Sequence, residues 1–391
     1  MTRVIGSRLK LLIALSLQLH LTAWCTQYLA QSGTAAARPK DHRPASLSEY
    51  QDRTNSQTDR MIGEYSRLPR TRLVFSANEV GAYGAVIKRV PDEVLLAWAD
   101  ALKEAGVQRI DMNPAISSIF DPVAARKYEA LIRHIGQIGL KIAINPEYEA
   151  GADGMFTAFK DFQNAALKAY AEWASRFHPD HFVLIHEPTT MANRMGLETT
   201  TFQWRAFVEA TAKVVKQASP ATRVGAGVFA GMGDHDVPFF EEFSRVPDLE
   251  FLTIDNYVDT PYAISRMDAL TKVAHDAHKP VYMEETWRPH FILPGTGKKK
   301  GASEESVSAI GFGYSGFEPL DVKWLNAMTL YAATHGMEAV TPFQTRCFFA
   351  YVESAPYDGP EFNHVVERAI LQKKRTETFR AFQQYIREYG Q

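Results

Sequence analysis

Short apolar runs alternate with longer amphipathic stretches along the chain from about residue 72 onward. The apolar runs have the length of buried strands, whereas the amphipathic stretches carry the 3.6-residue period of helices. Eight runs are predicted to be strands, at residues 73–76, 107–113, 141–145, 181–186, 223–228, 249–255, 280–285 and 339–343. Helices are expected to begin near Pro91, Asp121, Phe156, Thr199, Val237, Pro261, Pro319 and Phe362.

Eight strands that alternate with eight helices predict a (β/α)8 TIM barrel of the α/β class. Residues 262–277 illustrate the helical period, because they place Ile264, Met267 and Leu270 on one stripe. A doubly wound open sheet is the alternative, but no glycine-rich dinucleotide loop follows the first predicted strand. Since such barrels often run past roughly 250 residues as one unit, we expect a single domain over residues 71–391.

The first 37 residues have the pattern of an export signal. Basic side chains come first, at Arg3, Arg8 and Lys10. An apolar stretch at residues 11–24 and small residues at 35–37 follow, and Gln18 and His20 make the stretch a poor membrane span. We expect a signal peptide over residues 1–37 and a secreted or periplasmic protein, associated or not with the cell envelope, with no integral membrane span after processing. An uncleaved amphipathic anchor is the alternative.

Two further segments differ from the barrel pattern in composition. Residues 38–70 are rich in Arg, Ser, Asp and Gln and poor in aliphatic side chains, so they can bury little surface. We expect them to form a polar leader or linker, either flexible or lying against the barrel as a strap. Residues 288–318, between the seventh strand and the seventh helix, are predicted to shape the substrate cleft, because loops on that side form the active-site face.

Charge and cysteine content exclude several classes of protein. The formal net charge is −2 and the basic residues are scattered, whereas binding to nucleic acid needs a concentrated basic face. Nucleic acid is therefore not expected as a partner. Cys25 and Cys347 are the only cysteines, so a disulfide framework and a cysteine-ligated zinc site are both excluded.

Polar and acidic residues gather where the predicted strands end, which is where barrels of this class carry their chemistry. These residues are Asp111, Asn113, Glu147, His186, Glu187, Asp255, Tyr257, Glu284, Glu285 and Trp287. Like charges in a partly dry cleft shift one another's pKa, so that one carboxyl stays protonated beside an ionised partner. Hydrolysis of a glycosidic bond needs such a pair, one as the acid and one as the nucleophile.

Three segments resemble clan A of the glycoside hydrolases, which includes cellulase-, mannanase- and galactanase-like barrels. Residues 182–188 read FVLIHEP where those families carry an apolar strand that ends in Asn-Glu-Pro. Residues 279–285 read KPVYMEE, and residues 249–257 end in Asp-Asn-Tyr. The resemblance covers about residues 72–390. It implies that Glu187 is the acid/base, that Glu285 is the nucleophile and that Tyr257 touches the nucleophile, without a cofactor.

Three positions depart from the clan pattern. His186 replaces the asparagine that normally bonds the sugar 2-hydroxyl, and Asp111 stands where many members place an arginine that supports the nucleophile. The eighth strand ends in Phe343 and Gln344, where members often place a sugar-stacking tryptophan. The residues expected to contact the carbohydrate are His186, Tyr257, Asn113, Glu147, Trp287, Asp255 and Gln344. Glu284 is the alternative nucleophile.

The sequence thus predicts a retaining glycoside hydrolase for a β-linked glycoside or polysaccharide, with neither metal nor cofactor. Two other functions stay open. A non-catalytic carbohydrate-binding barrel would explain the departures at Asp111 and His186 as lost chemistry. A metal-dependent sugar isomerase or epimerase would use oxygen and nitrogen ligands from His186, Glu187, Asp255 and Glu285.

Overall fold

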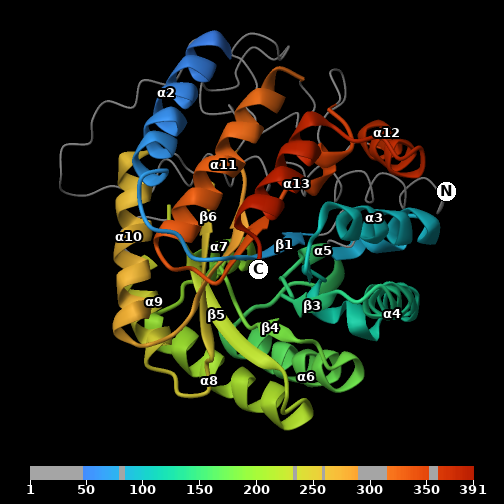
Figure 1. Cartoon of the computed structure of the whole chain (residues 1–391). Helices are drawn as coiled ribbons and strands as arrows, with labels where there is room; N and C mark the ends of the chain where they lie inside the picture. Colours follow the sequence, from blue (N-terminus) through green and yellow to red (C-terminus); the bar gives the residue numbers. More distant parts are fainter. Residues whose placement is uncertain (1–46, 79–83, 232–235, 258–259, 289–314, 352–359) are drawn as a thin grey trace, which may run out of the picture.

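The computed structural model of the protein describes residues 47–78, 84–231, 236–257, 260–288, 315–351 and 360–391. Its parallel strands close into a barrel in the order β1 to β8, with β8 paired to β1 (Figure 1). The strands are β1 Val74–Asn78, β2 Arg109–Met112, β3 Lys141–Ile144, β4 His181–Val183, β5 Arg223–Phe229, β6 Phe251–Asn256, β7 Val281–Thr286 and β8 Ala339–Pro342. All eight predicted strands are present, so the predicted barrel is confirmed.

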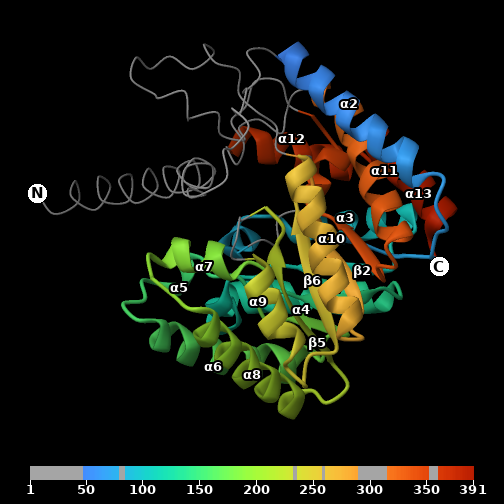
Figure 2. The ribbon, with the colours of Figure 1, turned by 90° about the vertical axis from the view of Figure 1, so that its left-hand side faces the viewer.

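Helices cover the outside of the barrel and follow the strands in the predicted alternation (Figures 1 and 2). The helices that match predicted starts are α3 Asp92–Ala105, α4 Pro122–Gln137, α6 Phe159–Phe177, α8 Thr201–Ala218, α9 Asp236–Ser244, α10 Pro261–Asp276, α11 Glu318–Thr334 and α12 Pro360–Leu371. Four α-helices in the described residues were not predicted, namely α2 Leu47–Tyr65, α5 Ala150–Asp153, α7 Pro188–Met195 and α13 Glu377–Tyr389.

Local sequence explains where several helices start. The side chain of Asp121 accepts hydrogen bonds from the first backbone amides of α4, and a proline occupies the first turn. Thr200 and Gln203 form a capping box at the start of α8. Between helices and strands the core is filled by large apolar side chains, of which Trp98, Trp173 and Trp324 are fully buried.

The polar segment that precedes the barrel contains a helix, which the sequence analysis did not predict. α2 packs along α11, and Figures 1 and 2 both show the two helices side by side. Tyr65 lies edge-on to Tyr331 at 5.5 Å, and Asp59 pairs with Lys323 at 2.9 Å. The hydroxyl of Thr54 accepts a hydrogen bond from Arg288 at 2.8 Å. Residues 47–65 therefore lie against the barrel as a strap.

Two predictions fall on segments that the structure does not describe. The predicted signal peptide at residues 1–37 and most of the predicted cleft segment, residues 289–314, lie outside the described residues. None of the helices in the described ranges is both long enough and apolar enough to cross a membrane.

Strands β5 and β6 approach so closely that position 227 of β5 must be a glycine. A Cβ atom added to Gly227 would collide with the carbonyl oxygen and the hydroxyl of Thr253. We expect Gly227→Ala to lower the free energy of unfolding by roughly 3 kcal/mol, because backbone rather than a flexible side chain must move. Gly63 in α2 has open space around it, so Gly63→Ala should raise the free energy of unfolding by about 0.5–1 kcal/mol. Urea denaturation of both variants measures the difference, and equal stabilities would contradict it.

Candidate active site

The predicted polar residues of five strands meet at the carboxyl end of the barrel. Asn113 follows β2, Glu147 follows β3, Glu187 follows β4, and Asp255 and Glu285 belong to β6 and β7. All five side chains are buried. Barrel closure therefore brings together side chains that are far apart in the sequence, at the end where such barrels carry their sites.

A β-bulge in β7 places two neighbouring glutamates inside the barrel. The pairing with β6 runs from Ile254–Met283 directly to Asp255–Glu285, so Glu284 is an extra residue. Side chains of a regular strand alternate between two faces, and a bulge interrupts that alternation. As a result, Glu284 and Glu285 both have polar partners inside the barrel, in two different layers.

The deeper layer consists of one arginine between two carboxyls. Arg109 binds Asp111 through two contacts, Nε to Oδ1 at 2.7 Å and Nη2 to Oδ2 at 2.8 Å. Its Nη2 also contacts Oε2 of Glu284 at 3.1 Å. Burial and the negative charge of Asp111 raise the pKa of Glu284 to about 8, although Arg109 opposes the rise. Glu284 is therefore a neutral acid at pH 7, beside a neutralised Arg109–Asp111 pair.

Arg109 was not identified from the sequence, although the strand period contains the signal. In β2 the side chains alternate, so Arg109, Asp111 and Asn113 share one face, and all three are buried in polar contacts inside the barrel. Strand β2 thus carries a buried arginine two residues before Asp111. Among the residues that the structure describes, its guanidinium pairs with Asp111 and Glu284 and not with Glu285.

Glu285 lies in the outer layer and accepts hydrogen bonds from two neutral donors. The Asn113 amide donates to Oε1 of Glu285 at 2.7 Å, and the Tyr257 hydroxyl donates to Oε2. The same amide nitrogen contacts Glu147 at 2.8 Å, and the Asn113 carbonyl accepts from Asn78 at 2.6 Å. Burial raises the pKa of Glu285 well above its ordinary value, and the positive charge of His186 acts against this rise.

His186 lies in the middle of the outer carboxylates. Its Nδ1 is 2.9 Å from Oδ2 of Asp255 and 3.7 Å from Oε1 of Glu285, and its Nε2 is 3.3 Å from Oε1 of Glu147. Arg194 of α7 pairs with the other oxygen of Glu147 at 2.6 Å. The outer layer thus holds cations and carboxylates in direct contact.

Glu187 is at the N-cap position of α7, directly after the residue that contacts the other carboxylates. Burial raises the pKa of Glu187 to about 7, and the charge of Asp255 adds to this rise, while His186 and Arg194 oppose it. A carboxyl with this pKa holds its proton in an appreciable fraction of molecules at neutral pH. It can therefore serve as a proton donor, which an ordinary surface glutamate cannot.

The aromatic candidates differ in their surroundings. Tyr257 lies edge-on to Phe229 at 5.3 Å and to Phe343 at 5.8 Å. Trp287 is only 1% exposed and lies 6.1 Å from the ring of Phe348, so in the described structure it faces protein rather than solvent. Gln344 is also buried, at the start of the 3₁₀ turn Thr345–Phe348.

Three of these side chains come close enough to be considered as metal ligands. Glu147, His186 and Glu285 each offer one atom within 4.8 Å of the others. The set differs from the ligands expected for an isomerase, because it contains Glu147 in place of Glu187 and Asp255. The Asn113 amide contacts both glutamates, and Arg194 binds Glu147, so donors and a cation already serve these oxygens.

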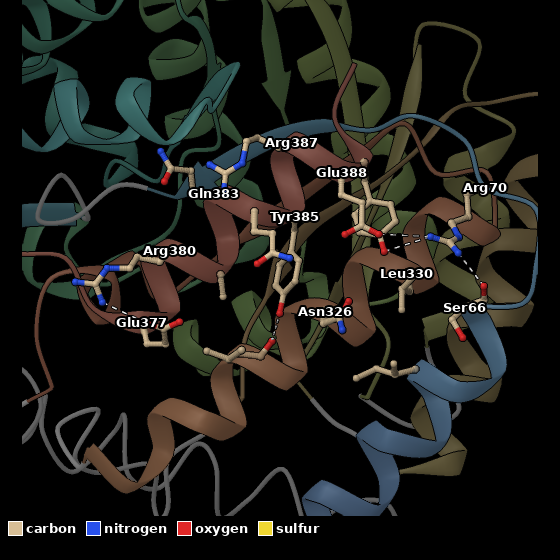
Figure 3. A pocket seen from close by; sticks show the side chains of 15 residues that line it. Ser66, Arg70, Asn326, Leu330, Glu377, Arg380, Gln383, Tyr385, Arg387 and Glu388 are labelled. Atoms are coloured by element: carbon tan, nitrogen blue, oxygen red, sulfur yellow. Dashed lines mark hydrogen bonds and ion pairs between the residues drawn. The ribbon is translucent and has the colours of Figure 1, made fainter.

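A groove with a polar lining lies elsewhere. It has a volume of about 720 Å³ and runs between α2, α11 and α13 on the outside of the barrel (Figure 3). Its lining is largely polar, with Arg70, Arg380 and Glu388 among the residues that point into it. None of its lining residues belongs to the carboxylate cluster, so groove and cluster are separate features.

No protein-family model matches the chain, and no curated protein sequence matches it either. Solved structures with the same barrel do match. The GH5_18 protein from Streptomyces cattleya in complex with GlcNAc shares 11% identity at a TM-score of 0.53, covering 82% of this chain and 81% of that protein. A glucosidase from Croceicoccus marinus shares 15% identity at a TM-score of 0.50, over 81% of this chain and 68% of that protein.

An exo-β-1,4-mannosidase from an Opitutaceae bacterium shares 14% identity at a TM-score of 0.51. The match covers 83% of this chain, which spans only 62% of the length of that mannosidase. At these identities the likeness establishes a common fold. The chain therefore shares its barrel with solved glycoside hydrolases of the kind that the sequence motifs resemble.

The deep layer allows a test of its charge balance. Arg109→Met should lower the free energy of unfolding by roughly 3–5 kcal/mol, because it leaves buried carboxyls without their cation. The loss should grow between pH 5.5 and pH 8, since the unpaired carboxyls have raised pKa values and must ionise as the pH rises. Denaturant unfolding at both pH values measures this, with the double variant Arg109→Met/Asp111→Asn as the control. A loss independent of pH would contradict the assignment.

Proposed function

We propose that the protein is a retaining glycoside hydrolase for β-linked glycosides or polysaccharides, with Glu187 as the acid/base and Glu285 as the nucleophile. The observation that carries the proposal is the difference between the two carboxyls. Glu285 accepts hydrogen bonds from Tyr257 and Asn113, which favour its ionised form and oppose the rise in pKa that burial causes. Burial raises the pKa of Glu187 to about 7, so that it can hold a proton at neutral pH. One proton donor and one carboxylate are what glycoside hydrolysis requires.

The two steps follow from these states. Glu187 gives its proton to the glycosidic oxygen while the Glu285 carboxylate attacks the anomeric carbon, so that the aglycone leaves and a glycosyl–enzyme ester forms. Glu187, now ionised, removes a proton from water, which attacks the same carbon and releases Glu285. Retention by this route requires the carboxyls to lie about 5–5.5 Å apart. Strand ends on different sides of one barrel mouth suit this arrangement.

The surroundings of Glu284 argue against it as the nucleophile. Its Oε2 contacts Arg109 in the deep layer, and this guanidinium also binds Asp111 through two contacts. Glu285, one residue further along the bulged strand, has the contacts to Tyr257 and Asn113 at the barrel mouth.

The structural neighbours support the choice of substrate class. They include an exo-β-1,4-mannosidase, a glucosidase and a GH5_18 protein in complex with GlcNAc. We therefore propose a β-linked hexoside as the substrate. We also propose that the protein acts outside the cytoplasm, because residues 1–37 have the pattern of an export signal.

A metal-dependent isomerase or epimerase is the second candidate, because Glu147, His186 and Glu285 offer ligand atoms close to one another. The isomerase or epimerase differs from the glycosidase in its need for a metal ion. A chelator should abolish isomerase activity, whereas hydrolysis by two carboxyls needs no ion.

The roles of the glutamates can be tested by sugar release from a panel of β-linked polysaccharides and aryl glycosides. Glu187→Ala should lower kcat by about 10²–10⁴-fold, and Glu285→Gln should lower it at least as far. Glu284→Gln is the matched control and should retain far more activity. A 2-deoxy-2-fluoro glycoside should label Glu285 covalently in the wild type, as read by mass spectrometry of peptides. Label on Glu284, or wild-type activity that is lost with chelator, would contradict the proposal.

The raised pKa of Glu187 predicts a pH profile. Because the protonated form of Glu187 is the active one in the first step, kcat/KM should fall as the pH rises through about 7. A dinitrophenyl glycoside leaves without protonation, so with this substrate the fall near pH 7 in the first step should disappear. If the fall persists with the activated substrate, it reports another group.

A further inference from the structure

Arg288, two residues beyond the end of β7, is buried although it carries a charge. Only 4% of the residue is exposed. Its Nη2 donates a hydrogen bond to the hydroxyl of Thr54 in α2 at 2.8 Å, and Thr54 is fully buried. The guanidinium lies over the ring of Trp324 in α11, 5.3 Å from the ring centre. The residue that ends the segment of Glu285 is thus held between two helices that lie outside the barrel.

The ring of Trp324 extends these contacts to the strands of the active site. Its indole nitrogen donates to the hydroxyl of Thr286 at 3.1 Å, and this hydroxyl donates to the backbone carbonyl of Asn256 at 3.0 Å. Thr286 follows Glu285 in β7, and Asn256 precedes Tyr257, which donates to Glu285. Because side chains alternate along a strand, Thr286 points outward to α11 while Glu285 points inward. The outward contacts therefore fix the strand that carries the inward carboxyl.

Helix α2 reaches this end of the barrel because it runs beside α11 in the same direction (Figures 1 and 2). Asp59 pairs with Lys323 near the start of α11, and Tyr65 meets Tyr331 near its end. Thr54 precedes Asp59 by five residues, which is roughly 7 Å along a helix. The order of these contacts places Thr54 past the start of α11, at the end of the barrel where the carboxyls gather.

The contact between Thr54 and Arg288 restricts the end of β7. Without the hydroxyl, a buried guanidinium would have a donor without its acceptor, which is costly in a dry environment. Arg288 could recover the bond only by turning toward water, and the backbone of the two preceding residues would move with it. A reacting group has to be held within about 0.5 Å, and a shift of about 1 Å can lower a rate by roughly 10²-fold.

We propose that α2 is part of the active-site scaffold, and that Thr54 and Arg288 are positioning residues which hold the end of β7 so that Glu285 faces the anomeric carbon. The effect on turnover rests on the proposed glycosidase function, whereas the effect on the order of β7 does not. The strap thus has a role in turnover as well as in stability.

Thr58, one turn later in α2, provides a matched control. It is also fully buried, and its hydroxyl donates to the backbone carbonyls of Thr54 and Asn55 in its own helix. Thr54→Val and Thr58→Val each replace a buried hydroxyl by a methyl group of similar size, so both variants should be less stable than the wild type. Thr54→Val in addition removes the acceptor that Arg288 uses.

Hydrogen–deuterium exchange of the full chain, read by mass spectrometry, tests the order of β7 without any substrate. Exchange of residues 281–288 is divided by that of residues 141–144 in β3, which corrects for global stability. We expect this ratio to rise about 5-fold in Thr54→Val and to stay at the wild-type value in Thr58→Val. A ratio that is unchanged in Thr54→Val, or that rises equally in both variants, would overturn the proposal. Thr54→Ala takes the place of Thr54→Val if the latter does not fold.

The kinetic measurement counts active molecules first, through the covalent label from the 2-deoxy-2-fluoro glycoside, so that unfolded molecules do not enter kcat. In Thr54→Val, kcat per labelled site should fall about 10-fold with KM changed less than about twofold, because the nucleophile is displaced while the sugar contacts remain. Thr54→Ser restores the hydroxyl and should recover most of kcat, and Thr58→Val should keep it.

An unchanged kcat per labelled site in Thr54→Val, or an equal fall in Thr58→Val, would mean that the strap only stabilises the fold and would overturn the proposal. A fall that Thr54→Ser does not reverse would overturn it too. Absence of turnover in the wild type would instead refute the proposed function, and the exchange ratio then decides the role of Thr54 by itself.

Discussion

The burial of several carboxyls at one end of a closed barrel is the constraint on which the site depends. Glu147, Glu187, Asp255 and Glu285 are all nearly inaccessible to solvent, and an ionised carboxylate is costly to bury without a partner. The barrel meets this cost in three ways. It supplies cations, it supplies neutral donors such as Asn113 and Tyr257, and burial raises the pKa of carboxyls such as Glu187, so that they can hold a proton at neutral pH.

The two layers solve the problem differently. In the deep layer one guanidinium binds Asp111 through two contacts, and the remaining carboxyl, Glu284, keeps a proton. In the outer layer an imidazole and Arg194 are distributed among four carboxyls, so charge is not fully balanced. The bulge in β7 makes both layers possible, because it directs consecutive glutamates to different depths. Two neighbouring glutamates thus have different polar partners, Arg109 for Glu284, and Asn113 and Tyr257 for Glu285.

Sequence periodicity was sufficient for the barrel and for the strand ends. The positions of Asn113, Glu147, His186 and Glu285 followed from the rule that parallel strands end on one face. Arg109 was not predicted because it lies before the end of its strand. Its spacing of two residues from Asp111 nevertheless indicates that both side chains lie on the same face of β2. The bulge at Glu284 could not be predicted from the sequence, because it arises from the register in which β7 pairs with β6 and β8.

Helix α2 was missed for another reason. Its residues are mostly polar, with Thr54 and Thr58 on the buried face, and it packs against α11 through contacts such as Tyr65 to Tyr331. The hydrophobic period of one segment does not reveal such contacts with a distant segment. The strands and helices with a regular apolar period were therefore predicted, whereas a polar helix that a distant helix stabilises was not.

The choice of cation in each layer has a physical consequence. A guanidinium remains charged at any pH that a folded protein meets, so the Arg109 layer has a fixed cation. An imidazole titrates near neutral pH, and the carboxyls of Asp255, Glu147 and Glu285 that surround His186 raise its pKa against the effect of burial. The charge state of His186 thus depends on the carboxyls that surround it. The carboxylates and the imidazolium stabilise one another's ionised forms, which makes the outer layer a single electrostatic unit rather than a set of independent residues.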